Sequence, residues 1–393
     1  MRPLFRSTLL ITTSLALSLI YAQTPQPRSC DNIQKQLTVA EQAQARGEWQ
    51  TALASYQDAE RISPTCAEAI VNMGTVYNRL NQPEQAIAAF QRAIALSPRL
   101  AAAHLNLGIT YFRVKRYNLA IESLERTVEI DPRNLQAQRL LGLSLIAVEQ
   151  FEKASIAFQN VVSITPDDSA ALFTLSEIYL RLKQYQKAVK HLEALVFLQP
   201  KVPKHHLILG EALENAGESE RAISEFRKAV SLDATLIEAH YALGQALLKQ
   251  GNPSEAIAEF QKELEVNPEM TLARYQLGKT YFQLGSLDEA IEALGKVIEV
   301  DPHFHPAFET LGQAWMKKGE PQRAVEALER AVQLNPKWPD AYALLGRAYQ
   351  QAGRRDDALK AFDTSKRLAQ EERQRLEQKL IEPKTTPSPT PYP

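Results

Sequence analysis

The chain has 393 residues, of which 45% are apolar and 23% are charged, so most of it is expected to fold. Its formal net charge is −1, which gives no support to nucleic-acid binding, because that function usually needs a strong basic excess. The two cysteines, Cys30 and Cys66, are too few for a disulfide-dense scaffold or a zinc site with four cysteine ligands.

The first 22 residues have the order of a secretory signal peptide. Two arginines precede an apolar run from Leu9 to Ile20, and the small residue Ala22 follows it. The run is short for a membrane span. We therefore predict a signal peptide at 1–22, cleaved after Ala22, in a chain that is exported to the periplasm or secreted. The alternative is an uncleaved segment that anchors the chain in a membrane.

Residue types recur through the rest of the chain with a period of 34. An alanine holds one place throughout: Ala52, Ala86, Ala120, Ala154, Ala188, Ala222, Ala256, Ala290, Ala324 and Ala358. A proline ends most units: Pro64, Pro98, Pro132, Pro166, Pro200, Pro268, Pro302 and Pro336. The period defines ten units: 33–66, 67–100, 101–134, 135–168, 169–202, 203–236, 237–270, 271–304, 305–338 and 339–372.

Each unit reads as two helices joined by a turn. Apolar residues stand at helical spacing in each half, and the final proline ends the second helix. A glycine recurs inside the first helix, where it costs about 0.5–1 kcal/mol relative to alanine. Its recurrence predicts close approach of the second helix, with the recurring alanine as the matching small residue. Such hairpins cannot bury their apolar faces alone, so neighbours should stack.

This pattern resembles the tetratricopeptide repeat family, whose motif is W-x2-L-G-x2-Y…A-x3-F…P. In the ninth unit the places of the motif are filled by Phe308, Leu311, Gly312, Trp315, Ala324, Leu328 and Pro336. The resemblance implies an all-α fold, a right-handed α-solenoid of ten stacked 34-residue helical hairpins with a C-terminal capping helix. Ala234 replaces one of the final prolines, and we expect a softer turn there without a break in the solenoid.

The ends of the array differ from its middle. Residues 23–32 form a linker before the first unit. We predict one long capping helix over 356–382, of which 373–382 extends beyond the tenth unit. Its apolar stripe is Leu359, Phe362, Ala369, Leu376 and Leu380. The Pro-rich segment 383–393 should be a disordered tail.

Little remains for chemistry outside the repeat. The sequence has no glycine-rich phosphate loop, no G-x-S-x-G elbow and no H-E-x-x-H. His104, His206 and His240 share one place in their units, but stacked helices lie about 8–10 Å apart, whereas ligands must converge at about 2 Å from a metal. We interpret them as packing residues, and we expect no metal, no cofactor and no enzymatic activity.

The two cysteines precede the first helices of adjacent units, Cys30 before unit one and Cys66 before unit two. Those helix starts should be close, and an oxidising compartment would then favour a disulfide. Two unpaired thiols are the alternative.

The resemblance implies that the first helices line a concave groove. An apolar, aromatic floor with a basic edge suits a peptide or helical segment of a protein partner. Packing between repeats is the alternative role for each of these residues. A clamp for chaperone C-termini is excluded, because no unit has a lysine at its fifth place. The candidate groove residues are Asn72, Arg79, Asn106, Phe112, Arg113, Phe173, Arg181, Leu207, Tyr241, Lys249, Tyr275 and Phe282.

These features favour a non-enzymatic protein–protein interaction scaffold outside the cytoplasm that supports assembly of an envelope complex. An accessory subunit of a glycan synthesis or export machine is the first alternative, and an enzyme is the second. The expected partner is a protein of unknown identity. We expect no binding to nucleic acid, and contact with a membrane only if the N-terminal segment is not cleaved.

Overall fold

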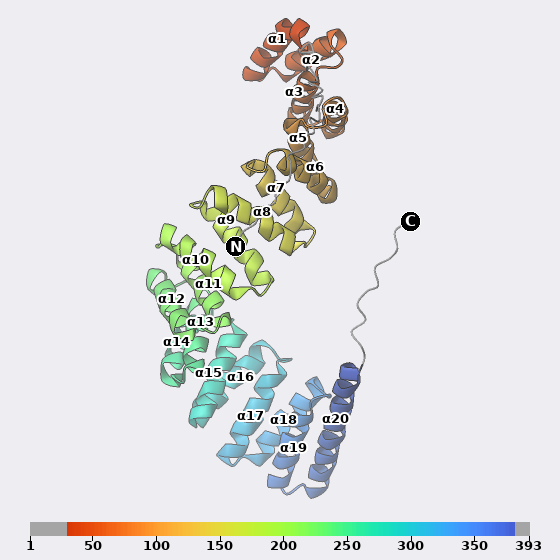
Figure 1. The fold of residues 1–393 in the computed structure, drawn as a ribbon. Coiled ribbons are helices and arrows are strands. Elements are labelled where there is room, and N and C mark those ends of the chain that lie inside the picture. Colours follow the sequence, from red (N-terminus) through yellow and green to blue (C-terminus); the bar gives the residue numbers. More distant parts are fainter. Residues whose placement is uncertain (1–29, 382–393) are drawn as a thin grey trace, which may run out of the picture. The chain divides into compact units, whose positions relative to one another are not determined.

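The structure is a computed structural model that describes residues 30–381. This part of the chain is all α, with no strand, and forms an α-solenoid of paired helices (Figure 1). It divides between Ile164 and Thr165 into two compact parts. From here on, these parts are called the first and the second unit, the 34-residue segments are called repeats, and each unit is described by itself. The predicted signal peptide and most of the predicted linker precede the described residues, and the predicted tail follows them.

The first unit holds four helical hairpins. A short 3₁₀ helix, η1, precedes them at Asp31–Ile33. The α-helices are α1 (Gln34–Ala45), α2 (Trp49–Ile62), α3 (Ala67–Arg79), α4 (Pro83–Leu96), α5 (Ala101–Arg113), α6 (Tyr117–Ile130), α7 (Leu135–Ala147) and α8 (Phe151–Ile164).

The second unit holds six hairpins, and its last helix is the longest. The first six helices are α9 (Ser169–Arg181), α10 (Tyr185–Leu198), α11 (Pro203–Asn215), α12 (Ser219–Leu232), α13 (Ala239–Lys249) and α14 (Pro253–Val266). The remaining helices are α15 (Thr271–Leu284), α16 (Leu287–Val300), α17 (His305–Lys318), α18 (Pro321–Leu334), α19 (Pro339–Gln351) and α20 (Arg355–Ile381).

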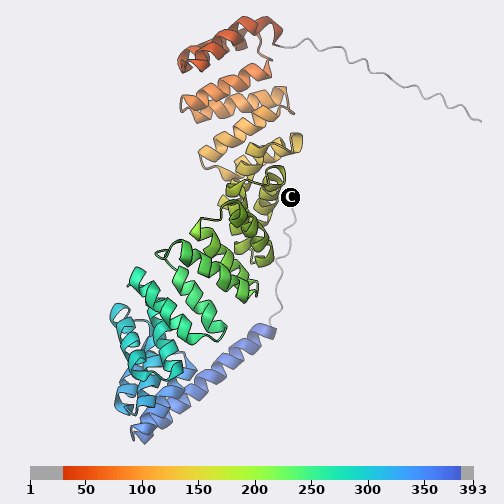
Figure 2. The same ribbon diagram turned by 90° about the vertical axis from the view of Figure 1, so that its left-hand side faces the viewer.

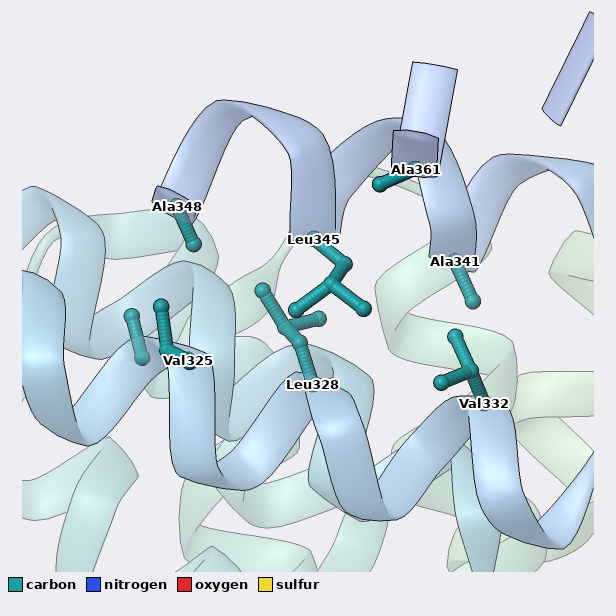
Figure 3. Close-up of a cluster of buried hydrophobic side chains, with 8 residues drawn as sticks. Val325, Leu328, Val332, Ala341, Leu345, Ala348 and Ala361 are labelled. Atoms are coloured by element: carbon teal, nitrogen blue, oxygen red, sulfur yellow. The ribbon is translucent and has the colours of Figure 1, made fainter. Parts of the chain in front are cut away.

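The core is built from small and branched side chains between neighbouring helices. In the cluster formed by α18, α19 and α20, Leu345 and Leu328 point toward one another, and Val332 lies opposite Ala341 (Figure 3). All four side chains are buried. Because consecutive helices pack against one another within each unit, the apolar faces are covered without a central core.

The glycine inside each first helix lies against a large side chain of the paired second helix. A Cβ added at Gly108 would lie 2.7 Å from Cγ of Leu124 on α6. The recurring alanine also lies close to this glycine, since the backbone oxygen of Ala120 would stand 3.5 Å from the same Cβ. The side chain in direct contact, however, belongs to the residue four places after the alanine, which was not predicted.

The turns inside the hairpins need a left-handed residue. Six of them use glycine, such as Gly251 with φ 85°, and four use another residue, such as Lys115 with φ 60°. Most side chains disfavour this conformation, so the turns at Lys115, Glu149 and Lys183 hold local strain, whereas asparagine at Asn81 tolerates it.

The last helix, α20, covers the end of the second unit and continues past its neighbours (Figure 2). The predicted apolar stripe is correct at Phe362, whose ring packs on Gly346 of α19, but wrong at Leu359 and Leu376, which are 63% and 56% exposed. Ala358, Ala361 and Leu368 are buried instead. Leu376 lies in the C-terminal part of α20, and the spacing of apolar residues could not show how far the neighbouring helices extend. The side chain of Leu380 lies outside the described residues.

A disulfide closes the N-terminal hairpin. It joins Cys30 and Cys66, whose Cα atoms are 5.1 Å apart. Ile33, Ala59 and Ala69 are buried in the cluster around it. The link therefore ties the start of α1 to the start of α3.

Candidate functional site

One surface of the solenoid is formed by the first helix of each hairpin. Several successive first helices within a unit contact one another, as α3 does with α5 and α11 does with α13. Among the described residues, no two second helices contact each other as extensively as these first helices do. The first helices therefore lie closer together, and we call their shared surface the inner face.

In the first unit, the predicted cations stand at the ends of first helices. The guanidinium of Arg79 lies 5.8 Å from the ring centre of Trp49, a cation–π distance. Arg113 is exposed and lines a small cavity of about 80 Å³ with Asn78 and Thr110. Asn78 donates to the Thr110 hydroxyl at 2.7 Å, so this cavity already has internal hydrogen bonds.

The other candidates of the first unit are partly buried. Asn72 bonds to Tyr56 of the preceding hairpin. The carbonyl of Asn106 accepts from Thr110 one turn later, and its side chain keeps some exposure. Phe112 packs edge-on against Tyr117, with ring centres 5.7 Å apart. The side chains of Asn72 and Phe112 therefore make contacts within the chain, and all three side chains keep some exposure.

In the second unit, two aromatic residues at the fifth place of a repeat pack near the junction with the next repeat. Phe173 lies 6.0 Å from the ring of His205 in the next repeat, and Tyr275 lies 5.1 Å from that of Phe304, the last residue of its own repeat. Tyr241 instead packs within its own hairpin, 5.9 Å from Phe260. All three predicted residues are partly buried, so each combines a packing contact with an accessible edge.

Two lysines at the predicted basic edge of the second unit make contacts within the chain. The ammonium of Lys317 lies 4.5 Å from the ring centre of Phe282. Lys249 pairs with Glu214 at 2.5 Å. Arg181 is exposed at the end of α9. The charge of Lys249 is therefore neutralised by an ion pair within the chain.

The prediction that Leu207 is accessible to a partner is wrong. The sequence places it on the groove floor, but its side chain is only 6% exposed. It lies on α11, which packs against both of its sequence neighbours and against α13, so it contributes to packing and offers no surface to a partner.

The inner face holds a cavity of about 440 Å³ between α11 and α13, which we call the α11–α13 hollow. Glu211 and Glu214 line it from α11, and Tyr241 and Lys249 line it from α13. The rest of the lining is Asn215, Phe226, Glu238, Ala242, Gln245, Ala246, Met270 and Leu272. Two predicted residues thus meet here with three carboxylates that were not predicted.

An irregular start of α13 brings Glu238 to the hollow. Helices α11 and α15 begin at the first residues of their repeats, whereas α13 begins at Ala239, the third residue of its repeat. Glu238 has a left-handed φ of 71°. The fully buried carboxylate of Glu263 accepts from the backbone N–H groups of Glu238 at 2.9 Å and Tyr241 at 3.1 Å. Glu263 therefore caps the shortened helix.

The electrostatics of the hollow reflect crowded carboxylates. Burial, and secondly the charge of Glu238, raise the pKa of Glu211. Burial also raises the pKa of Tyr241, whose hydroxyl accepts from Gln245 at 2.6 Å. A raised pKa means that the ionised form of each group is disfavoured, as expected where carboxylates lie close together and are partly desolvated.

The sequence does contain signals for these missed residues. The twelfth place carries a large apolar residue in several repeats, such as Phe112 and Phe282, but Glu214 in the sixth. Glu263 stands where adjacent repeats have Ala229 and Val297. A charged residue at a core place marks a local departure from the repeat.

The three equivalent histidines are buried, and each bonds to residues of its own or the preceding repeat. His104 and His206 bond through Nε2 to the carbonyls of Pro98 and Pro200, at 2.9 and 3.0 Å. His206 also meets Glu225 at 2.6 Å, and His240 meets Glu259 at 2.5 Å. They do not converge on one point.

One group of potential metal ligands occurs among residues 30–381, namely Cys30, Cys66 and Glu68. The two sulfurs are bonded to each other, so neither is available as a thiolate ligand. No helix in this described stretch is long and apolar enough to cross a membrane.

Comparisons with known proteins agree with the architecture. Tetratricopeptide repeat models match residues 66–133, 145–211, 241–302 and 316–380, and a TPR repeat model matches 215–251, which together exceed half of the chain. A search of curated proteins gave no match.

Among solved structures, a crystal structure of MamA is 27% identical, covers 42% of this chain and 97% of its own, and has a TM-score of 0.41. YrrB, described as a TPR protein with an unusual peptide-binding site, is 23% identical, covers 46% and 94%, and scores 0.41. The structure of Naa15/Naa10 bound to HypK-THB is 15% identical over 86% of this chain and 64% of that one. Its TM-score of 0.53 reflects the shared fold.

Proposed function

Because this chain belongs to the tetratricopeptide repeat family, whose members serve as protein-interaction scaffolds, we propose that it binds a peptide or helical segment of a protein partner on its inner face. It does so outside the cytoplasm, without catalysis, and supports assembly of an envelope complex. The observation that carries this proposal is the α11–α13 hollow, where Tyr241 and the apolar side chains of Met270 and Leu272 stand beside charged groups.

Two features support the proposed location. The first is the order of charge, apolar run and small residue at the N-terminus. The second is the bonded pair Cys30 and Cys66, which suits an oxidising compartment. Cell fractionation and mass spectrometry of the N-terminus test both cleavage after Ala22 and export.

Partner capture tests the inner face. Phe173→Ala with Tyr241→Ala should weaken capture in the native host about tenfold or more, because aromatic anchors dominate binding. Arg113→Ala should weaken it less, and more so at low salt. Phe197→Ala, on a side chain that is 85% exposed on the second helix α10, is the matched control.

Capture at wild-type strength by a double variant that keeps its helicity would show that the inner face is not the binding surface. Crosslinking and mass spectrometry identify the partners. Components of a polysaccharide machine among them would favour an accessory role in glycan synthesis or export. Hydrolase or transferase activity of the isolated chain would contradict a non-enzymatic role.

A further inference from the structure

The α11–α13 hollow has an excess of negative charge. Three carboxylates line it, from Glu211, Glu214 and Glu238, against the single ammonium of Lys249. That ammonium is already paired with Glu214 at 2.5 Å. The chain therefore neutralises one of the three carboxylates and leaves two.

The two remaining carboxylates have no cation of their own. Within residues 30–381, neither Glu211 nor Glu238 forms an ion pair, and the charge of Glu238 acts unfavourably on Glu211. In the same hollow, Oε2 of Glu214 is buried without a hydrogen-bond partner in the described structure. Buried acceptors of this kind are normally satisfied. The site thus presents acceptors and negative charge that a donor from outside would satisfy.

The apolar residues that line the rest of the hollow determine which kind of donor fits. Tyr241, Met270 and Leu272 provide apolar surface beside the carboxylates, and Leu272 is 49% exposed. A small hydrated ion would gain nothing from these walls. A long side chain with an apolar stem and a cationic head fits both, because the stem lies on apolar surface while the head reaches the carboxylates. Arginine and lysine have this form, and the arginine fork can bond two carboxylates at once.

We propose that the α11–α13 hollow binds an arginine or lysine side chain of the partner segment, with Glu211 and Glu238 as its counter-charges. This inference rests on the proposed function and specifies its ligand: a basic segment with apolar neighbours. It reverses the expectation of a basic edge that receives acidic groups, because the cation predicted for this edge is paired inside the chain.

A random-peptide library displayed on phage tests the inference with the full chain as bait. The wild type should enrich peptides with arginine or lysine next to apolar residues. Glu211→Gln with Glu238→Gln should weaken binding of the selected peptides about tenfold or more, since two charge-assisted contacts are lost. Glu299→Gln with Glu326→Gln, which removes the same charge from exposed positions on second helices, should leave binding unchanged.

Charge reversal gives a gain of function that misfolding cannot imitate. Glu211→Lys with Glu238→Lys should shift the selected peptides from basic to acidic sequences. Selection of peptides without basic residues, or equal binding by the neutral variant, would overturn this inference while leaving peptide binding by the inner face intact. Failure of the wild type to select any peptide would overturn the inference and the proposed function together.

Discussion

Gly244 of α13 lies directly against the ring of Phe260 on α14. A Cβ added at Gly244 would stand 2.6 Å from Cε1 of Phe260, whose side chain is fully buried. Gly244→Ala should therefore destabilise the protein by about 1–2 kcal/mol, since overpacking outweighs the better helix propensity of alanine. Chemical denaturation followed by circular dichroism measures this change.

A second background and a control variant test whether the ring of Phe260 causes this loss of stability. In a Phe260→Ala background, Gly244→Ala should cost about 1 kcal/mol less, because the ring is gone. Gly295→Ala should stabilise α16 by up to about 1 kcal/mol, since no atom lies within 4 Å of the added Cβ. An equal cost of Gly244→Ala in both backgrounds would rule out the steric explanation.

At the left-handed turn positions, introducing a glycine and removing one should have opposite effects on stability. Lys115→Gly should stabilise the protein by up to about 1 kcal/mol, because lysine at φ 60° is strained. Gly251→Ala should destabilise it by about 1 kcal/mol or more, and nothing near Gly251 would obscure this backbone effect. Asn81→Gly should change little, since asparagine tolerates this conformation. Equal effects at Lys115 and Asn81 would contradict the role of strain.

Removal of the disulfide should weaken one end of the array. Cys30→Ser with Cys66→Ala should cost at most about 3–4 kcal/mol, the chain-entropy value for a closed loop of this size. Because repeats couple mainly to their neighbours, hydrogen exchange should accelerate in α1–α4 and much less beyond them. Uniform acceleration across the chain would contradict nearest-neighbour coupling.

Glu211→Gln should stabilise the protein slightly at pH 7. The folded-state pKa of Glu211 is raised by partial desolvation and by Glu238, and the effect on stability is small because the residue is exposed to solvent. Such a group contributes its full stability below its unfolded pKa of about 4.3, and this contribution is lost as the pH rises through the folded pKa. The advantage of the variant should therefore disappear near pH 4. Urea midpoints at the two pH values measure this difference, with exposed Glu299→Gln as control. Lower stability of Glu211→Gln than of the wild type at pH 7 would contradict this prediction.

The repeat could be predicted because three residue types share one period and each has a local cause. The positions of the helix-interior glycines and final prolines suffice to place two helices per repeat. The hollow depends on contacts between residues far apart in sequence. The place of Glu238 is set by the Glu263 carboxylate from another helix, and the burial of Leu207 is set by its neighbours. Periodicity places a residue on a face, but it does not say which neighbour covers it.

The bond between Cys30 and Cys66 also limits how far the chain can be stretched. When the protein is pulled from its two ends, the residues inside this loop cannot extend, because the crosslink carries the force past them. An extended chain gains about 3.3–3.6 Å per residue, so the 36-residue separation hides roughly 120 Å of contour length until the bond is reduced. In an optical trap, this hairpin would therefore contribute almost no length to the unfolding trace.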